Sequence, residues 1–193
     1  MIQTAGLVFE ELSDEQFDPA LGTSTAAGYI FGTSGGVAEA AMRTIVEKVT
    51  GTVSDKTDFL ELRGMQGVKE AEYDLNGRKI KVAVVSGLKN VGELLDRIKA
   101  GEVHYDVIEV MASPGGCIGG GGQPIHNGHT MNYTNINGLR SAALYKGAAD
   151  SRSVRKSHES PVIQEVYRDL LGEPGSENAH KWLHTKYEAR PKN

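Results

Sequence analysis

A glycine-rich segment that follows a predicted strand constrains the fold of this chain more than any other feature. It reads Val110-Met111-Ala112-Ser113-Pro114-Gly115-Gly116-Cys117-Ile118-Gly119-Gly120-Gly121-Gly122-Gln123-Pro124 and comes after apolar and β-branched residues that begin at Tyr105. Six of the chain's 24 glycines fall within eight residues here, together with its only cysteine. Neither a packed helix nor a strand tolerates so many glycines. We therefore expect a strand that ends in a loop whose backbone closely approaches another group.

Glycine-rich loops after strands commonly bind one of two kinds of ligand, a phosphate group or a metal centre. A phosphate-binding loop requires Gly-x4-Gly-Lys-Ser/Thr, but Gly121 follows Gly115-x4-Gly120, and Gly-x-Gly-x-x-Gly fits no frame of the segment. The second candidate is a metal or cluster held by Cys117, because glycines leave room and free N–H groups for inorganic sulfur. A surface loop with an incidental cysteine is the plain alternative, and composition leaves it open.

Composition narrows the class of protein. The length of 193 residues suits one domain with a modest core, 1–193. The net charge is −4 with scattered basic residues, which argues against a nucleic-acid partner. No apolar run reaches the roughly 20 residues of a membrane span, and no secretory leader is visible. A single cysteine excludes an internal disulfide framework and fits a reducing compartment, so we expect a cytoplasmic protein.

Hydrophobic patterns predict an α/β fold with a mixed, partly parallel sheet flanked by helices. Asn76-Gly77 between two β-forming runs is a strong hairpin signal. A strand, a helix and a strand then follow in order, which favours a parallel pair whose carboxyl ends face a ligand. Strands are predicted at 28–32, 59–62, 68–75, 79–85 and 105–111, helices at 37–49, 91–100, 139–146, 162–171 and 177–183, with a loop at 19–27 and a linker from Thr50.

The glycine-rich segment resembles the last cluster-binding motif of the iron-only ([FeFe]) hydrogenases, Met-Ala-Cys-Pro-Gly-Gly-Cys-x-x-Gly-Gly-Gly-Gln-Pro. Ser113 stands where that family has its first cysteine. A second stretch, from Phe31 to Arg43, is similar to the family's Phe-Gly-x-[Ser/Thr]-Gly-Gly-Val-Met-Glu-Ala-Ala-[Leu/Met]-Arg, with Ala38 in place of methionine. Residues 155–187 resemble the family's C-terminal signature, in which Ser160 replaces an asparagine and no catalytic role is expected.

The resemblance implies a cofactor and a set of site residues. The family's H-cluster joins a [4Fe–4S] cubane, held by four cysteines, to a di-iron unit, and exchanges electrons with ferredoxin-like carriers. Cys117 matches the cysteine that bridges the two parts, Ser113 matches another cubane ligand, and Met111 matches the methionine beside the di-iron unit. Phe31 and Gly32 match residues that line the cluster pocket. The family's other two ligands, its proton-relaying cysteine and its cyanide-pairing lysine belong to upstream motifs that this sequence lacks.

These matches predict an incomplete catalytic unit. The chain covers about the C-terminal half of the family's two-lobed catalytic domain and begins within an element, so we expect a fragment or a split half, completed by a partner chain or by upstream sequence. Clusters of this kind commonly need four thiolates, and one cysteine cannot supply them. The isolated chain should therefore hold no H-cluster and turn over no hydrogen, and its uncovered apolar surface should favour self-association.

Two alternatives stay open. One is a non-catalytic hydrogenase relative that binds a partner or a cluster, which Ser113 and Ala38 favour. The other is a mononuclear metal or thiol site at Cys117, with His126 and His129 as further zinc ligands, although their spacing matches no common zinc site.

Overall fold

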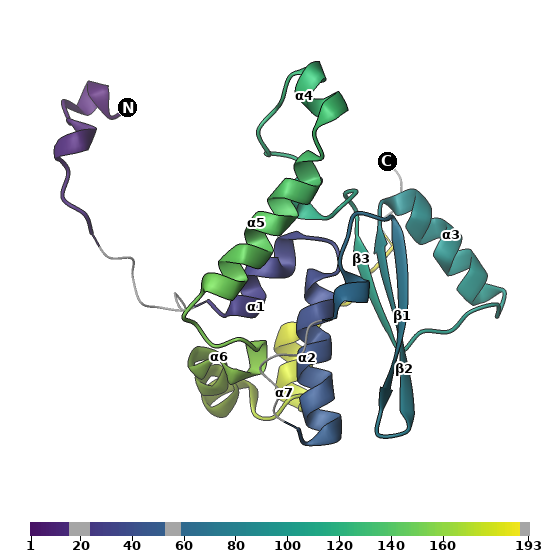
Figure 1. Ribbon diagram of the computed structural model, residues 1–193. Helices are drawn as coiled ribbons and strands as arrows, with labels where there is room; N and C mark the ends of the chain where they lie inside the picture. Colours follow the sequence, from purple (N-terminus) through teal and green to yellow (C-terminus); the bar gives the residue numbers. More distant parts are fainter. Residues whose placement is uncertain (16–23, 53–58, 190–193) are drawn as a thin grey trace.

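The fold is built on a three-stranded mixed sheet. The computed structural model describes residues 1–15, 24–52 and 59–189. The strand order is β1 (Val68–Leu75), β2 (Arg78–Ser86) and β3 (Val107–Met111). β1 pairs with β2 in the antiparallel sense and β2 with β3 in the parallel sense, which confirms the predicted partly parallel α/β architecture (Figure 1).

The β1–β2 connection is the hairpin that Asn76-Gly77 predicts. Leu75 pairs with Arg78, so the turn has two residues. Both of them have positive φ, 56° at Asn76 and 84° at Gly77. A two-residue turn of type I′ requires this conformation at both positions, which Asn-Gly adopts at little cost.

The parallel pair is connected through α3 (Leu88–Lys99), which ends before Gly101 with φ at 73°. Ser86 at the end of β2 pairs with Met111 at the end of β3, and the Gly87 N–H donates to the Met111 carbonyl at 2.9 Å. The carboxyl ends of both strands therefore meet where the glycine-rich segment begins.

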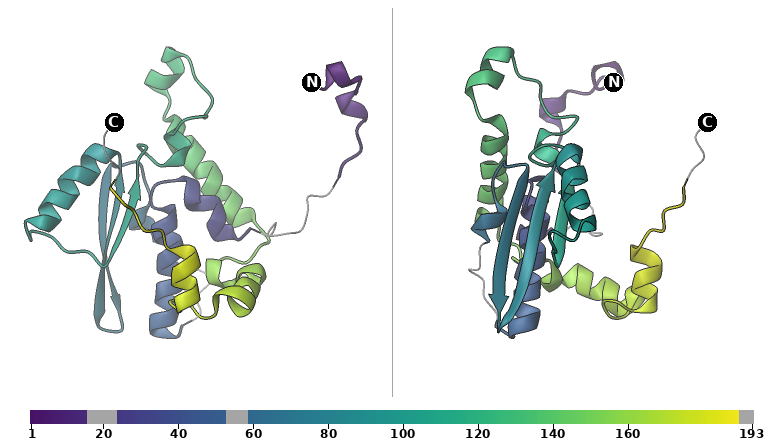
Figure 2. Two further views of the ribbon diagram at one scale, coloured as in Figure 1. Left: turned by 180° about the vertical axis from the view of Figure 1, so that it is seen from behind. Right: turned by 90° about the vertical axis from the view of Figure 1, so that its right-hand side faces the viewer.

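Two helices cover the two faces of the sheet (Figures 1 and 2). α2 (Gly36–Thr50) packs on one face through a cluster that includes Met42, Leu62 and Val84. α3 packs on the other face, where Leu94 meets Ala83 and Val85. The periodicity predicts both helices, but the packed faces differ in part from the predicted ones: Ala38 and Met42 of α2 face the sheet, whereas Val37 and Val49 of α2 and Leu95 of α3 are 40–45% exposed.

Two predicted strands are wrong. Residues 28–32 form the end of α1 (Ala26–Tyr29) and the 3₁₀ turn η3 (Ile30–Gly32). The Thr25 side chain caps this turn by accepting from the Gly28 N–H, and a short apolar run cannot by itself distinguish strand from helix. Residues 59–62 end in the 3₁₀ turn η4 (Leu60–Leu62), which places Phe59 and Leu62 on one buried side.

The other regular elements of the described residues are helical. α5 (Ile136–Asp150) is longer than predicted and lies beside α1 (Figure 1). The predicted helix at 162–171 is α6 (Pro161–Val166) followed by a π-helical turn, η7 (Tyr167–Leu171). α7 (Glu177–Leu183) has the predicted bounds and is capped by the Ser176 side chain. The remaining short elements are η1 (Gln3–Ala5), η2 (Phe9–Glu11), η5 (Cys117–Gly119), α4 (Gly128–Tyr133) and η6 (Ser157–Glu159).

Residues 1–15 are exposed along their whole length. Much of the predicted loop at 19–27, and much of the linker after Thr50, lie outside the described residues. No helix in the described part of the chain combines the length and the apolar character needed to cross a membrane.

Candidate functional site

The glycine-rich loop, residues 112–124, leaves the end of β3 and packs against a second loop. The Gly115 N–H donates to the Ser86 hydroxyl at 3.3 Å, which ties the loop to the end of β2. The Gly115 carbonyl accepts from the Ser34 N–H at 2.9 Å. Ser34 lies in the loop between η3 and α2, so the structure joins the two motifs that the sequence analysis identified.

Gly116 allows this close approach. Its φ is 95°, and a Cβ atom at this position would lie 2.7 Å from the Ser34 nitrogen, 2.8 Å from the Met111 sulfur and 2.9 Å from the Gly32 carbonyl oxygen. Real Cβ atoms do not come so close to backbone atoms, so only glycine fits here. Met111 and Gly32, two of the predicted site residues, therefore lie together at this contact.

The other three predicted site residues lie around the same contact. Cys117 begins η5 and is exposed. Ser113 is half-buried, and its hydroxyl is 3.2 Å from the place where a Cβ on Gly120 would be. Phe31, next to Gly32, is 42% exposed. The thiol of Cys117, the hydroxyl of Ser113 and the thioether of Met111 therefore lie around the contact between the two loops at Gly116.

A buried carboxylate on β3 holds the second loop in place. Glu109 is 8% exposed and accepts hydrogen bonds from the Gly35 N–H at 2.6 Å and the Ala38 N–H at 2.7 Å. These donors belong to the start of α2, where Gly35 has no side chain to cap the helix. A carboxylate at a helix N-terminus satisfies free N–H groups and matches the positive end of the helix dipole.

A buried lysine, Lys69, lies in the same cross-strand row as this carboxylate, two strands away. Lys69 pairs with Val84, and Val84 pairs with Glu109, so the three form one row across the strands. The Lys69 ammonium donates to the Ser34 carbonyl and to the Gly64 carbonyl, each at 2.9 Å. Burial lowers the pKa of Lys69 to about 8, while the negative charge of Glu109 acts in the opposite direction. A positive and a negative charge thus hold the backbone of the second loop.

A second buried network joins α2 to α5. The Glu39 carboxylate, fully buried, accepts from Arg43 at 2.6 Å, from Arg63 at 2.6 and 2.8 Å, and from the Tyr145 hydroxyl at 3.1 Å. The Arg63 guanidinium also stacks 4.2 Å from the centre of the Tyr145 ring. Burial, with the nearby charge of Glu39, raises the pKa of Tyr145. The phenol therefore stays a neutral donor to the carboxylate.

Helix α5 contacts both loops of the site. Its Ser141 hydroxyl lies 2.9 Å from the Thr33 hydroxyl of the second loop. Its Asn137 amide lies close to Gly115 and Gly119, where added Cβ atoms would meet it at 3.3 and 2.9 Å. The buried start of the glycine-rich loop, around Gly115, is therefore contacted by β2, by the second loop and by α5.

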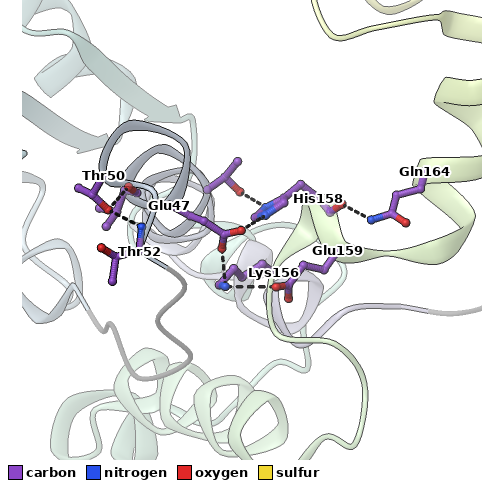
Figure 3. A network of polar contacts seen from close by, with 9 residues as sticks. Glu47, Thr50, Thr52, Lys156, His158, Glu159 and Gln164 are labelled. Carbon is purple, nitrogen blue, oxygen red and sulfur yellow. Dashed lines mark hydrogen bonds and ion pairs between the residues drawn. The ribbon is translucent and has the colours of Figure 1, made fainter.

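A polar network between α2 and η6 contains the only three-ligand metal-type group among the described residues. Glu47, His158 and Glu159 offer ligand atoms within 4.8 Å of one another. The buried Lys156 ammonium lies between the two carboxylates, 2.5 Å from Glu47 and 3.1 Å from Glu159, while His158 contacts Glu47 (Figure 3). The ammonium thus takes the place that a cation would occupy. Cys117, His126 and His129 do not form such a group, so the zinc alternative gains no support from the geometry.

The residues of this chain do not by themselves fit an H-cluster. A cubane commonly takes four thiolates, and the sequence contains one cysteine. A serine hydroxyl is a hard ligand with a high pKa, so Ser113 is a poor substitute for a thiolate. The single thiol, on Cys117, is free and exposed.

Several residues that build the site lie outside the two sequence motifs. Glu109 stands between Val107 and Met111 on the inward side of β3, and a charged residue on an apolar face is the signal that could have revealed it. Lys69 gives the same signal on β1, where it shares a face with Ala71 and Leu75. Asn137 and Ser141 lie in a helix far along the chain, and no sequence pattern relates them to the loops.

Comparisons with known proteins agree with the two motifs. The family profile described as "Iron only hydrogenase large subunit, C-terminal domain" matches residues 1–121, and the one described as "Iron hydrogenase small subunit" matches residues 135–190. The NADP-reducing hydrogenase subunit HndD of Solidesulfovibrio fructosivorans is 46% identical over 97% of the chain, which spans 31% of that protein. Iron hydrogenase 1 of Clostridium pasteurianum is 38% identical over 97% of the chain, which spans 32% of it.

Other relatives have a different role. The mouse protein named cytosolic iron-sulfur assembly component 3 is 27% identical over 97% of the chain, which spans 41% of it.

Solved structures give the same family. A variant of the [FeFe]-hydrogenase HydA1 from Chlamydomonas reinhardtii superimposes with a TM-score of 0.67 at 36% identity, over 96% of this chain and 52% of that one. A further similar structure, with a TM-score of 0.66, is described as revealing stepwise H-cluster assembly. The chain spans about a third of these hydrogenase relatives and about half of the solved chains. It belongs to the iron-only hydrogenase family and corresponds to the C-terminal part of the catalytic domain.

Proposed function

We propose that this chain forms the C-terminal lobe of an iron-only hydrogenase catalytic unit and supplies Cys117 to an H-cluster completed by ligands from outside the sequence. One observation carries the proposal: the only thiol of the chain is exposed on a glycine-rich loop that packs against the second family motif. Met111, Ser113, Phe31 and Gly32 would then lie beside the cluster. When bound, that cluster supplies reversible oxidation of hydrogen and reduction of protons, with a ferredoxin-type carrier exchanging the electrons.

The chain alone would be inactive on this proposal. It has one of the thiolates that a cubane needs, and it spans about half of the solved hydrogenase chains. The missing N-terminal half, as upstream sequence or as a partner chain, would bring the remaining ligands. A cytoplasmic location is part of the same proposal, because an unpaired cysteine suits a reducing compartment.

We propose also that residues 1–193 act as one unit. Two family profiles match separate parts of the chain: one ends at residue 121 and the other begins at residue 135. However, α5 lies beyond that division and contacts α1 and both loops of the site. These contacts favour a single domain over two independent ones.

Iron analysis with complementation in trans tests the proposal. The chain would be purified without oxygen, alone and co-expressed with the upstream region of the HndD relative, and reconstituted with iron and sulfide. We expect no bound cluster on the chain alone and about four irons of the cubane type per complex. Cys117→Ala should remove this iron, whereas Ser113→Cys should retain or increase it.

Two outcomes contradict the proposal. About four irons on the monomeric chain alone would show that one thiolate suffices, against the usual ligand requirement. Full iron content in the complex that carries Cys117→Ala would exclude Cys117 as a ligand.

A non-catalytic role is the second candidate. Ser113 and Ala38 depart from the hydrogenase motifs, and some relatives are named as iron–sulfur assembly components. In the same complex, supplied with a preformed di-iron unit as well as with iron and sulfide, a stable cubane without hydrogen turnover, both in the wild type and with Ser113→Cys, would favour this second role over a catalytic one.

A further inference from the structure

We infer that Arg140 is a positioning residue that holds the Cys117 loop in its binding conformation. The inference deepens the proposed function and rests on it for its significance. Arg140 lies on α5, in the region matched by the small-subunit profile, whereas Cys117 lies in the region matched by the large-subunit profile.

The contacts of Arg140 fall on both sides of the glycine run. One guanidinium nitrogen donates to the Ile118 carbonyl at 2.7 Å, directly after Cys117. The other donates to the Pro124 carbonyl at 3.1 Å and lies 3.2 Å from the His126 ring. A single side chain thus connects two backbone points that lie on either side of the four consecutive glycines, 119–122.

Little besides Arg140 orders the part of the loop that contains the glycine run 119–122. Gly121 and Gly122 have open space around the positions of their absent side chains, and Cys117 itself is exposed. Glycine has the largest conformational freedom of any residue, so a run of four is costly to hold in one conformation. Donors fixed on a long helix reduce this freedom before any ligand binds.

The shape of arginine matters to this role. Its planar guanidinium presents several donors in a rigid fork and stays protonated at all ordinary pH values. The two backbone carbonyls lie within reach of different nitrogens of that fork. Lysine keeps the charge but offers a single flexible ammonium, which cannot reproduce the same pair of contacts.

Hydrogen exchange on the full chain, without any cluster, tests the inference. The Gly119 and Gly120 N–H groups donate within the loop to Gly116 and Cys117 carbonyls at 3.0 Å each, so their exchange reports its opening. Arg140→Ala removes charge-assisted hydrogen bonds to two loop carbonyls, so we expect it to speed exchange in peptide 113–124 by at least about tenfold, with Arg140→Lys in between. Exchange in β2 should stay unchanged.

A nitroxide label on Cys117 gives a second, local measurement, because the chain has no other thiol. Arg140→Ala should make the label more mobile. Lys146→Ala is the matched control: it removes an exposed cation from the same helix, where Lys146 pairs with Asp150, and should change neither measurement.

Wild-type exchange and label mobility in a folded Arg140→Ala protein would overturn the inference. If that variant does not fold, Arg140→Lys decides: unchanged loop exchange overturns the inference, and faster exchange supports it. The iron content of the wild-type complemented complex is measured separately from both loop readouts, so failure of this inference is distinct from failure of the proposed function.

Discussion

Replacing Glu109 by alanine should be among the most damaging single changes in this fold. Its carboxylate accepts from the Gly35 and Ala38 N–H groups at 2.6 and 2.7 Å, and so provides from β3 the cap that Gly35 cannot provide to α2. The site depends on the same contact, because the neighbouring Ser34 N–H binds the glycine-rich loop.

The cost can be estimated from these contacts. Two buried N–H groups would lose their acceptor, at about 1–3 kcal/mol each. Loss of the negative charge at the start of α2 adds roughly 0.3–1 kcal/mol. Water entering the space left by the side chain would recover part of this, so we expect a loss of about 3 kcal/mol, a large share of the roughly 5–15 kcal/mol that stabilises a typical domain.

Urea denaturation followed by far-UV circular dichroism measures this change. Glu109→Gln should fall between wild type and Glu109→Ala, because one amide oxygen can accept but the amide nitrogen cannot. Glu93→Ala is the matched control, since that carboxylate is exposed on α3 and pairs only loosely with Lys89 at 3.8 Å. A Glu109→Ala protein within about 1 kcal/mol of wild type, the range of exposed ion pairs, would refute the reasoning.

Further predictions concern the loop and the two charged clusters. Gly116→Ala should cost more than about 2 kcal/mol in urea denaturation because its Cβ meets backbone atoms; Gly121→Ala, with open space around it, should cost less than about 0.5 kcal/mol, and equal costs would contradict the packing argument. Because burial lowers the pKa of Lys69 to about 8, the unfolded chain binds more protons above that pH, so stability should rise by about 2 kcal/mol between pH 7 and 9.5. Lys69→Met should abolish this rise. A wild-type protein whose stability does not rise between pH 7 and 9.5 would show that the pKa of Lys69 is not lowered. The hydrogen bond from Lys156 lowers the pKa of Glu47, so its contribution is present above pH 4.5 and lost as pH falls through the lowered value. The melting-temperature difference between wild type and Glu47→Gln should therefore shrink in acid, and a constant difference would exclude this linkage.

Local sequence patterns predict the parts of this fold that depend on neighbours in the chain. Asn76-Gly77 gives the hairpin because its turn needs positive φ at both residues. The apolar spacing of residues 37–49 gives α2, and the strand, helix and strand order gives the parallel pair. The position of the glycine-rich loop at the end of β3 follows from the same reasoning.

The parts that depend on distant segments could not be predicted in this way. The row of Lys69, Val84 and Glu109 exists only in the register of three strands. Residues 28–32 form no strand because a threonine cap and two buried alanines start a helical turn. Arg140 reaches the loop from a helix whose direction no local pattern specifies.

The glycine-rich loop and the two segments that contact it at Gly115, the second loop and α5, lie far apart in the order of synthesis. The second loop leaves the ribosome first, the glycine-rich loop follows some eighty residues later, and α5 comes last. A nascent chain therefore exposes its only thiol while the helix that holds the loop is still inside the ribosome. Because domains begin to fold during synthesis, Cys117 passes through a period in which its loop is unsupported. Premature capture of iron or an oxidant at that stage would compete with correct assembly.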